Sequence, residues 1–140
     1  MQILYGFILA TIVAYIAYRA HSLNKSGAGA AIVVGTVIFG IGGWEWAVLL
    51  LTFFITSSGL SRAFKKRKAG LNQKFSKGHE RDAGQVLGNG GLATLFAALH
   101  AFYPESTLPW VGFAASLAAV NADTWATELG ILNPTPPRMI

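Results

Sequence analysis

Long apolar runs, interrupted by one strongly basic stretch, constrain this chain more than any other feature of its sequence. Each run is close to the ~20 residues that a helix needs to cross the hydrocarbon core of a bilayer. Charged residues make up only 12% of the chain, against about 25% in a typical soluble domain. We therefore predict an all-α fold, a polytopic transmembrane helix bundle of about five spans forming a single domain over residues 1–140. The predicted spans cover residues 2–18, 27–43, 44–60, 86–103 and 108–130.

The distribution of basic residues favours one orientation of these spans. Arg19 and Lys25 fall between the first two runs, eight basic residues fall between the third and fourth, and Arg138 follows the last. Cytoplasmic loops carry an excess of lysine and arginine, so we expect an outside N-terminus, a basic cytoplasmic loop over residues 61–85 and a cytoplasmic C-terminus in the cell membrane. The first run lacks the basic start and cleavage pattern of a signal peptide, and we expect it to be a retained helix. Basic residues confined to such loops argue against a nucleic-acid partner.

A stripe of small residues marks the second run. Gly27, Ala31 and Gly35 follow one another at intervals of four, a spacing that lets a neighbouring helix backbone come close. We interpret the stripe as a packing surface, with a homo-oligomer interface as one place where it would serve. The sequence contains no cysteine, which excludes disulfides, thiolate metal sites and a cysteine nucleophile.

Two polar clusters flank the basic loop. Ser57 and Ser58 end the third run; hydroxyls in helices often bond back to the preceding turn, so a structural role stays open for them. The second cluster begins at Arg81 and contains three glycines around Asn89. Each glycine costs a helix interior about 1 kcal/mol relative to alanine, which makes sense where a backbone must approach a ligand or another helix. An anion site at a helix N-terminus and a flexible packing hinge are both open.

The third cluster stands within the last run. Carboxylates at membrane depth are costly unless they are paired, coordinated or wet, so Asp123 and Glu128 are functional candidates. At 100° per residue Asn121, Thr124 and Glu128 share one helix face, while Asp123 lies on another. Either the helix is locally unwound there, or the two carboxylates meet partners from different neighbours. A solvated position for both at the membrane interface is a third interpretation.

Together these clusters predict a site for a phosphorylated lipid. The topology places all three at the cytoplasmic ends of their spans. Carboxylate and amide oxygens suit Mg²⁺, which binds through one or two carboxylates plus substrate phosphates, and the basic residues would neutralise those phosphates. An apolar groove beneath them would hold a lipid tail. The basic loop has an alternative role in holding anionic lipid headgroups.

The same motifs resemble those of the integral membrane family called domain of unknown function 92, which includes a plant phytyl-phosphate kinase. The resemblance rests on Ser57-Ser58 with the basic run after them, on the segment from Arg81 to Gly91 and on the segment from Asn121 to Gly130. Similar sequences continue beyond a segment like Pro137–Ile140. A natural short form, a fragment, and one half of a site completed by another copy are the open alternatives.

The resemblance implies a transferase, a prenyl-phosphate kinase that passes the terminal phosphoryl group of a nucleoside triphosphate to an isoprenoid monophosphate. Asp123 and Glu128 would hold Mg²⁺, with Asn89 as a further oxygen ligand or phosphate contact. The other predicted substrate and phosphate contacts are Ser57, Ser58, Arg62, Lys65, Arg81, Asp82, Gln85, Gly88, Gly90, Gly91, Asn121 and Thr124. The alternative is a small membrane transporter or lipid-binding protein in which Asp123 and Glu128 relay protons or ions.

Overall fold

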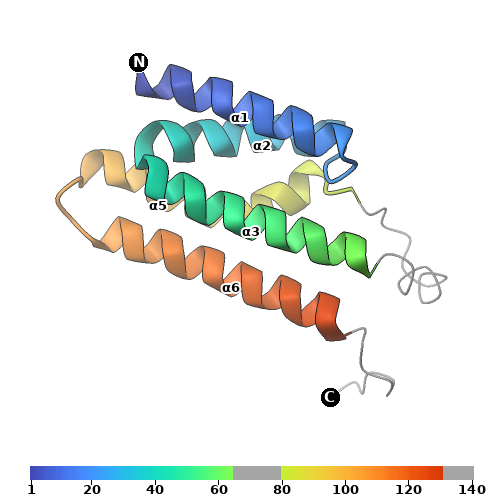
Figure 1. Ribbon diagram of the computed structural model, residues 1–140. Helices are drawn as coiled ribbons and strands as arrows, with labels where there is room; N and C mark the ends of the chain where they lie inside the picture. Colours follow the sequence, from blue (N-terminus) through green and yellow to red (C-terminus); the bar gives the residue numbers. More distant parts are fainter. Residues whose placement is uncertain (65–79, 131–140) are drawn as a thin grey trace.

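A computed structural model describes residues 1–64 and 80–130 of the chain. These residues form a helix bundle that contains no β-strand in the described ranges, which confirms the predicted all-α class. The helices run alongside one another, and successive helices reverse direction, except that η1 continues α2 (Figure 1). In order they are α1 (Gln2–Arg19), α2 (Lys25–Val37), the π-helical segment η1 (Ile38–Gly42), α3 (Trp44–Ala63), α5 (Ala83–Phe102) and α6 (Leu108–Gly130).

Helix α1 shows why this bundle suits a membrane. Its buried residues are all small, whereas its large apolar residues are exposed, for example Ile3 at 62% and Ile12 at 51%. In a soluble protein such side chains would be drawn inside by the hydrophobic effect, but lipid is as apolar as they are, so small residues take the helix contacts instead. The buried residues of α1 are Gly6, Ala10, Ala14 and Ala17.

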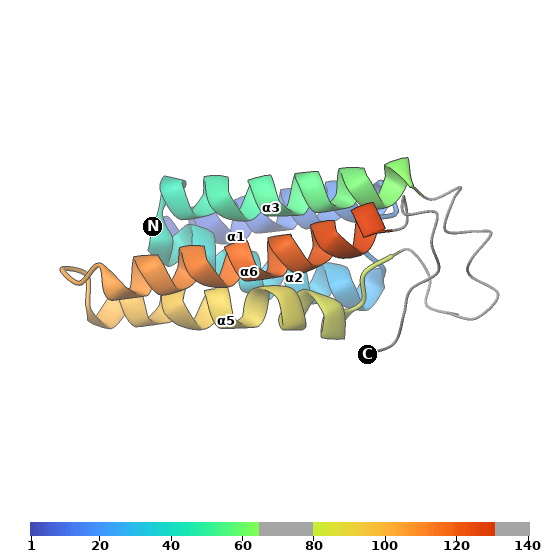
Figure 2. The same cartoon turned by 90° about the horizontal axis from the view of Figure 1, so that it is seen from below.

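Three helical stretches are long and apolar enough to cross a membrane: α1, the stretch Lys25–Gly42 made of α2 and η1, and α3. Helices α5 and α6 are of similar length, with 20 and 23 residues, and lie beside the others (Figures 1 and 2). Glycines and the polar residues of the second and third clusters reduce their hydropathy. The count of five spans and the orientation of the chain stay predictions.

A cluster of aromatic rings holds α3, α5 and α6 together at the end of the bundle opposite Arg62. The ring of Trp46 lies 4.4 Å from that of Phe113, 5.2 Å from Trp110 and 5.1 Å from the imidazole of His100, measured between centroids. Phe113 is fully buried and Trp46 nearly so. Tilted aromatic pairs at these distances each add about 0.5–1.5 kcal/mol beyond their buried area. These contacts fix the register in which α6 lies along α3.

The small-residue stripe of α2 packs within the chain. A Cβ added to Gly35 would lie 2.8 Å from the Cβ of Ala10 on α1, and one added to Gly27 would lie 2.0 Å from the carbonyl oxygen of Arg81. Both glycines therefore allow close contacts that a larger residue would prevent. A homo-oligomer stays a prediction, and these two residues are already used inside the monomer.

Replacing Gly27 by alanine should therefore destabilise the protein by about 1–3 kcal/mol, because the added methyl group must displace backbone rather than a flexible side chain. Gly29, on the same helix, provides the matched control, because a Cβ there would meet nothing within 4 Å. Gly29→Ala should be neutral or stabilising by up to ~1 kcal/mol through helix propensity. Thermal unfolding in detergent measures both. Equal unfolding temperatures for the two variants would show that the contact at Gly27 carries no stability.

Candidate functional site

The start of α5 is tied by main-chain bonds to the turn between α1 and α2. The amide of Arg81 donates to the carbonyl of Ser22 at 3.0 Å, and the amide of Asn24 donates to the carbonyl of Arg81 at 3.1 Å. These bonds form an isolated parallel bridge between Leu23 and Arg81. Leu23 is 1% exposed, so the bridge is anchored by a buried side chain. Arg81 therefore has a fixed position that does not depend on its own side chain.

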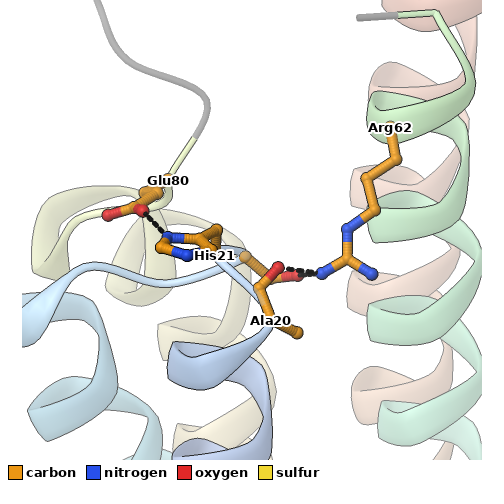
Figure 3. Close-up of polar contacts among 5 residues, drawn as sticks. Ala20, His21, Arg62 and Glu80 are labelled. Carbon is orange, nitrogen blue, oxygen red and sulfur yellow. Dashed lines mark hydrogen bonds and ion pairs between the residues drawn. The ribbon is translucent and has the colours of Figure 1, made fainter.

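Polar side chains reinforce this connection from two sides. The guanidinium of Arg62, at the end of α3, donates to the carbonyl of Ala20 and, at 2.8 Å, to the hydroxyl of Ser22. His21 Nδ1 lies 2.7 Å from Glu80 Oε1. Figure 3 shows both contacts converging on the α1–α2 turn from opposite sides. Arg62, predicted to bind phosphate, thus bonds to protein, and its phosphate role stays a prediction.

Both helices that begin at this end carry an N-terminal cap. The side chain of Asn24 accepts a hydrogen bond from the amide of Gly27 at 2.8 Å, and that of Asp82 accepts one from the amide of Gln85 at 2.8 Å. Such caps satisfy amides that a helix start leaves without partners and stabilise it by about 1 kcal/mol. The structure thus gives Asp82 and the Gln85 backbone a local role at the start of α5.

The side chain of Arg81 contacts α3 and lies within the electrostatic influence of Glu128 on α6. Its Nη1 donates to the hydroxyl of Ser58 at 3.0 Å, and its guanidinium carbon lies 5.4 Å from the centre of the Phe54 ring. Burial lowers the pKa of Arg81 from its ordinary value, and the negative charge of Glu128 acts in the opposite direction. Arginine stays protonated in proteins, so the arrangement places a permanent cation, partly removed from water, among these helices.

Glu128 faces the interior of the bundle. It is 5% exposed, and its Oε1 accepts a hydrogen bond of 2.6 Å from the hydroxyl of Ser61 on α3. Ser61 and Glu128 are 67 positions apart in the sequence. Trp46 and Phe113, which also pair across α3 and α6, are separated by the same number of positions. Helices α3 and α6 therefore run in the same direction in constant register. A carboxylate held in this way is bound by protein rather than merely solvated at an interface.

The same register places two further polar groups in the seam between α3 and α6. Ser57 lies level with Thr124, one turn from Asn121. Ser57 is fully buried, and within the described part of the chain neither its hydroxyl nor the side-chain oxygen of Asn121 has a hydrogen-bond partner. A buried polar atom without a partner costs about 1–3 kcal/mol. A bound ligand could supply the partner, so Ser57 and Asn121 are candidates for ligand binding.

Asp123 lies apart from Glu128. Helix α6 is continuous from Leu108 to Gly130, so it is not unwound at the third cluster, and the two carboxylates diverge by about 140° around the helix at 100° per residue. Asp123 is exposed, whereas Glu128 is buried. Residues 1–64 and 80–130 contain no group of three acidic, histidine or cysteine side chains placed to hold a metal. Mg²⁺ would fit only through a single carboxylate together with phosphates of a ligand.

The glycines of the second cluster lie inside α5. Gly88 and Gly91 face open space, while Gly90 is buried against Val34. Because they lie beyond the first turn of the helix, their amides are engaged in helical hydrogen bonds. A ligand could approach their exposed surface but would find no free amide there. Lys65, another predicted phosphate contact, lies outside the described residues.

An apolar pocket lies next to Arg81. It is partly open, has a volume of about 70 Å³ and is lined by residues of α1, α2, α3 and α5. Arg81 and Asn89 are the polar and charged side chains in its wall. The polar clusters predicted from sequence therefore meet an apolar space, although most of the residues around that space were not predicted.

Several interactions at this end were not predicted, and two of them had a sequence signal that could have been recognised. Asn24 directly precedes a helical run and matches the N-cap preference for asparagine. Ser61 follows Ser57 by one helical turn and so shares its face. The contact of Phe54 with Arg81 had no such signal, because it joins elements that are distant in sequence.

Comparison with known proteins agrees with this picture of an integral membrane helix bundle. The chain matches the family described as integral membrane protein DUF92 over residues 8–140 and belongs to it. This confirms the resemblance drawn from the three motifs. No solved structure gives a significant match.

Among its relatives are a plant and an archaeal protein. Protein PGR of Arabidopsis thaliana is 30% identical over 152 residues, which cover 99% of this chain and 52% of the plant protein. The uncharacterized membrane protein MJ0933 of Methanocaldococcus jannaschii is 29% identical over 143 residues, covering all of this chain and 57% of the archaeal one. The chain thus spans about half the length of these curated relatives.

Proposed function

We propose that this protein takes part in phosphoryl transfer from a nucleoside triphosphate to an isoprenoid monophosphate at the cytoplasmic face of the cell membrane. The observation that carries the proposal is a partly buried cation, Arg81, at the wall of an apolar pocket and within the electrostatic reach of Glu128. A phosphate attached to a hydrocarbon chain matches both halves of this arrangement. The family resemblance supplies the reaction type.

In the proposed reaction an oxygen of the substrate's phosphate attacks the terminal phosphorus of the nucleotide. A new P–O bond forms, the bond from that phosphorus to the bridging oxygen breaks, and the nucleoside diphosphate leaves. The substrate brings its own nucleophile, so the protein needs only to position the reactants and balance their charge. This requirement suits a sequence that contains no cysteine.

The residues at the end of the bundle where α5 begins have different roles in the proposed reaction. Arg81 holds the acceptor phosphate, and Ser58 keeps its guanidinium in place. Asp123 is the better placed carboxylate for Mg²⁺, because it is exposed while Glu128 is engaged with Ser61. When bound, Mg²⁺ would neutralise nucleotide phosphates. Glu128 would act as a positioning residue through its charge on Arg81.

Incubation of the purified chain with labelled nucleotide, Mg²⁺ and phytyl or geranylgeranyl phosphate tests the proposal. We expect labelled diphosphate product, reduced by Asp123→Asn by at least tenfold while the unfolding temperature stays unchanged, because the exposed carboxylate contributes little to stability. Glu105→Gln, a change of an exposed carboxylate in the turn at the opposite end, serves as the matched control. Absence of product, or equal turnover in the Asp123 variant, counts against the proposal.

The burial of Glu128 supports a second candidate, a transporter or lipid-binding protein in which this carboxylate relays ions or protons. Intramembrane carboxylates commonly mark such pathways. This function predicts flux in liposomes that needs no nucleotide and that Glu128→Gln abolishes. Nucleotide-dependent thermal stabilisation, with and without Mg²⁺, separates the two candidates.

A further inference from the structure

We propose that the pocket between α1, α2, α3 and α5 holds the head-proximal part of the hydrocarbon chain of a single-chain lipid phosphate, whose phosphate lies at Arg81. The pocket is the same whether the chain is isoprenoid or acyl, and only the choice of an isoprenoid rests on the proposed function. Most of the side chains that would contact the tail belong to the first half of the sequence.

Small residues of two helices create the space. Ala10, Ala14 and Ala17 of α1 face the pocket, and Ala31 and Gly35 of α2 line the adjoining wall. Longer side chains at these positions would fill the volume. The opposite wall consists of larger apolar residues of α3, namely Leu50, Leu51, Phe53 and Phe54.

The polarity of the wall indicates an amphiphilic ligand. Arg81, just before α5, and Asn89, in the second turn of α5, are the polar lining side chains, and the remaining ones are apolar. Phe54 belongs to both environments, because its ring lines the pocket and lies beneath the Arg81 guanidinium. A purely apolar ligand would make no use of this cation, and inorganic phosphate would make no use of the apolar wall. A chain with an anionic head uses both.

The dimensions limit how much of the chain is enclosed. A dry cavity of about 150 Å³ in another protein accommodates benzene, and this pocket measures about 70 Å³. It can therefore take only a short piece next to the head. Helix α1 packs on α2 and η1, whereas α3 packs on α6 and η1. The seam between α1 and α3 is thus the side on which the rest of the chain can leave toward lipid.

Binding of farnesyl phosphate to the purified full chain, measured by calorimetry in detergent without nucleotide, tests the pocket. Farnesol and inorganic phosphate should each bind at least tenfold more weakly, because each offers only half of the ligand. Lysophosphatidate distinguishes the source of the chain: equal binding would identify a general single-chain lipid phosphate pocket, and weaker binding an isoprenoid one. Either result with lysophosphatidate supports the proposal, whereas equal binding of farnesol and farnesyl phosphate would overturn it.

Two substitutions that fill the pocket from different helices make the test specific. Ala31→Phe and Leu51→Trp alter half-buried lining residues, and each should weaken farnesyl phosphate binding at least tenfold. Ala118→Phe, at an exposed position of α6 outside the pocket, should not change it. Unchanged affinity in both pocket variants would falsify the assignment.

A photoreactive farnesyl phosphate analogue provides a measurement that needs no variant. Labelling should fall on peptides containing residues 10–17 and 50–54, and labelling confined to α6 would contradict the pocket.

The binding and activity measurements also distinguish the lipid pocket from the proposed kinase function. If binding depends on the pocket but no diphosphate forms, the lipid pocket is supported and the kinase activity is contradicted. If diphosphate forms and Ala31→Phe and Leu51→Trp do not affect it, the kinase activity is supported and the pocket is contradicted.

Discussion

Replacing Arg81 by alanine is expected to weaken farnesyl phosphate binding by about 10- to 150-fold. The estimate follows from the ~1.5–3 kcal/mol that a hydrogen bond to a charged group contributes, at about 1.4 kcal/mol for each factor of ten. The bridge to Leu23 uses only the main chain of Arg81, so the variant should keep the connection between α5 and the α1–α2 turn. Calorimetry in detergent, with thermal unfolding measured in parallel, gives both quantities.

Two further variants test whether Arg81 is the phosphate contact. Arg81→Lys keeps the charge but loses the planar fork, so its affinity should fall between those of the wild type and the alanine variant. Arg19→Ala removes an exposed basic residue from the last turn of α1, at the same end of the bundle, and should leave the affinity within about twofold. If Arg81→Ala binds as tightly as the wild type, Arg81 is not the phosphate contact.

Glu128→Leu should be the most destabilising change at the third cluster, with a loss of about 2–3 kcal/mol in the free energy of unfolding. The variant removes the acceptor of the Ser61 hydroxyl and the negative charge that acts on Arg81, and a partly buried donor left without its partner costs about 1–3 kcal/mol. Asp123→Asn, on the same helix, should change stability by less than ~0.5 kcal/mol because Asp123 is exposed. Denaturant unfolding in mixed micelles measures both.

A double-mutant cycle isolates the contact itself. Ser61→Ala and Glu128→Leu, alone and combined, should be non-additive by about 1.5–3 kcal/mol, the range for a hydrogen bond to a charged group. Ser106→Ala, in the turn between α5 and α6, combined with Glu128→Leu should be additive, because the two sites share no contact. Additive effects of Ser61 and Glu128 would mean that the observed bond carries no stability.

The sequence predicted the helical class and the polar clusters because both depend on local features. Apolar runs of nearly the span length need no partner to be recognised, and Asn121, Asp123 and Glu128 interrupt such a run visibly. Helical periodicity also predicted that Asp123 and Glu128 lie on different helix faces, and the unbroken α6 agrees with that separation. The family followed from the motifs themselves.

The partners of those residues could not be predicted in the same way. The sequence placed Arg62 and Asp82 among the phosphate contacts, and that role stays a prediction. It did not reveal that Arg62 bonds to the α1–α2 turn or that Asp82 caps α5. A basic or acidic side chain near a helix end has several uses of similar energy, and neighbouring elements decide among them. The contact of Arg81 with Ser58 joins residues 23 positions apart, which periodicity within one helix cannot detect.

The membrane character of this protein was thus determined by its sequence, since hydropathy and charge are sums over residues that hold in any arrangement of the helices. The composition of the site was decided by the tertiary structure. The close approach at Gly27, the bridge from Leu23 to Arg81 and the constant register of α3 on α6 bring the clusters to one end and leave the pocket beside them. Such relations arise from packing between segments distant in the chain, and only their positions in space show which polar residue meets which partner.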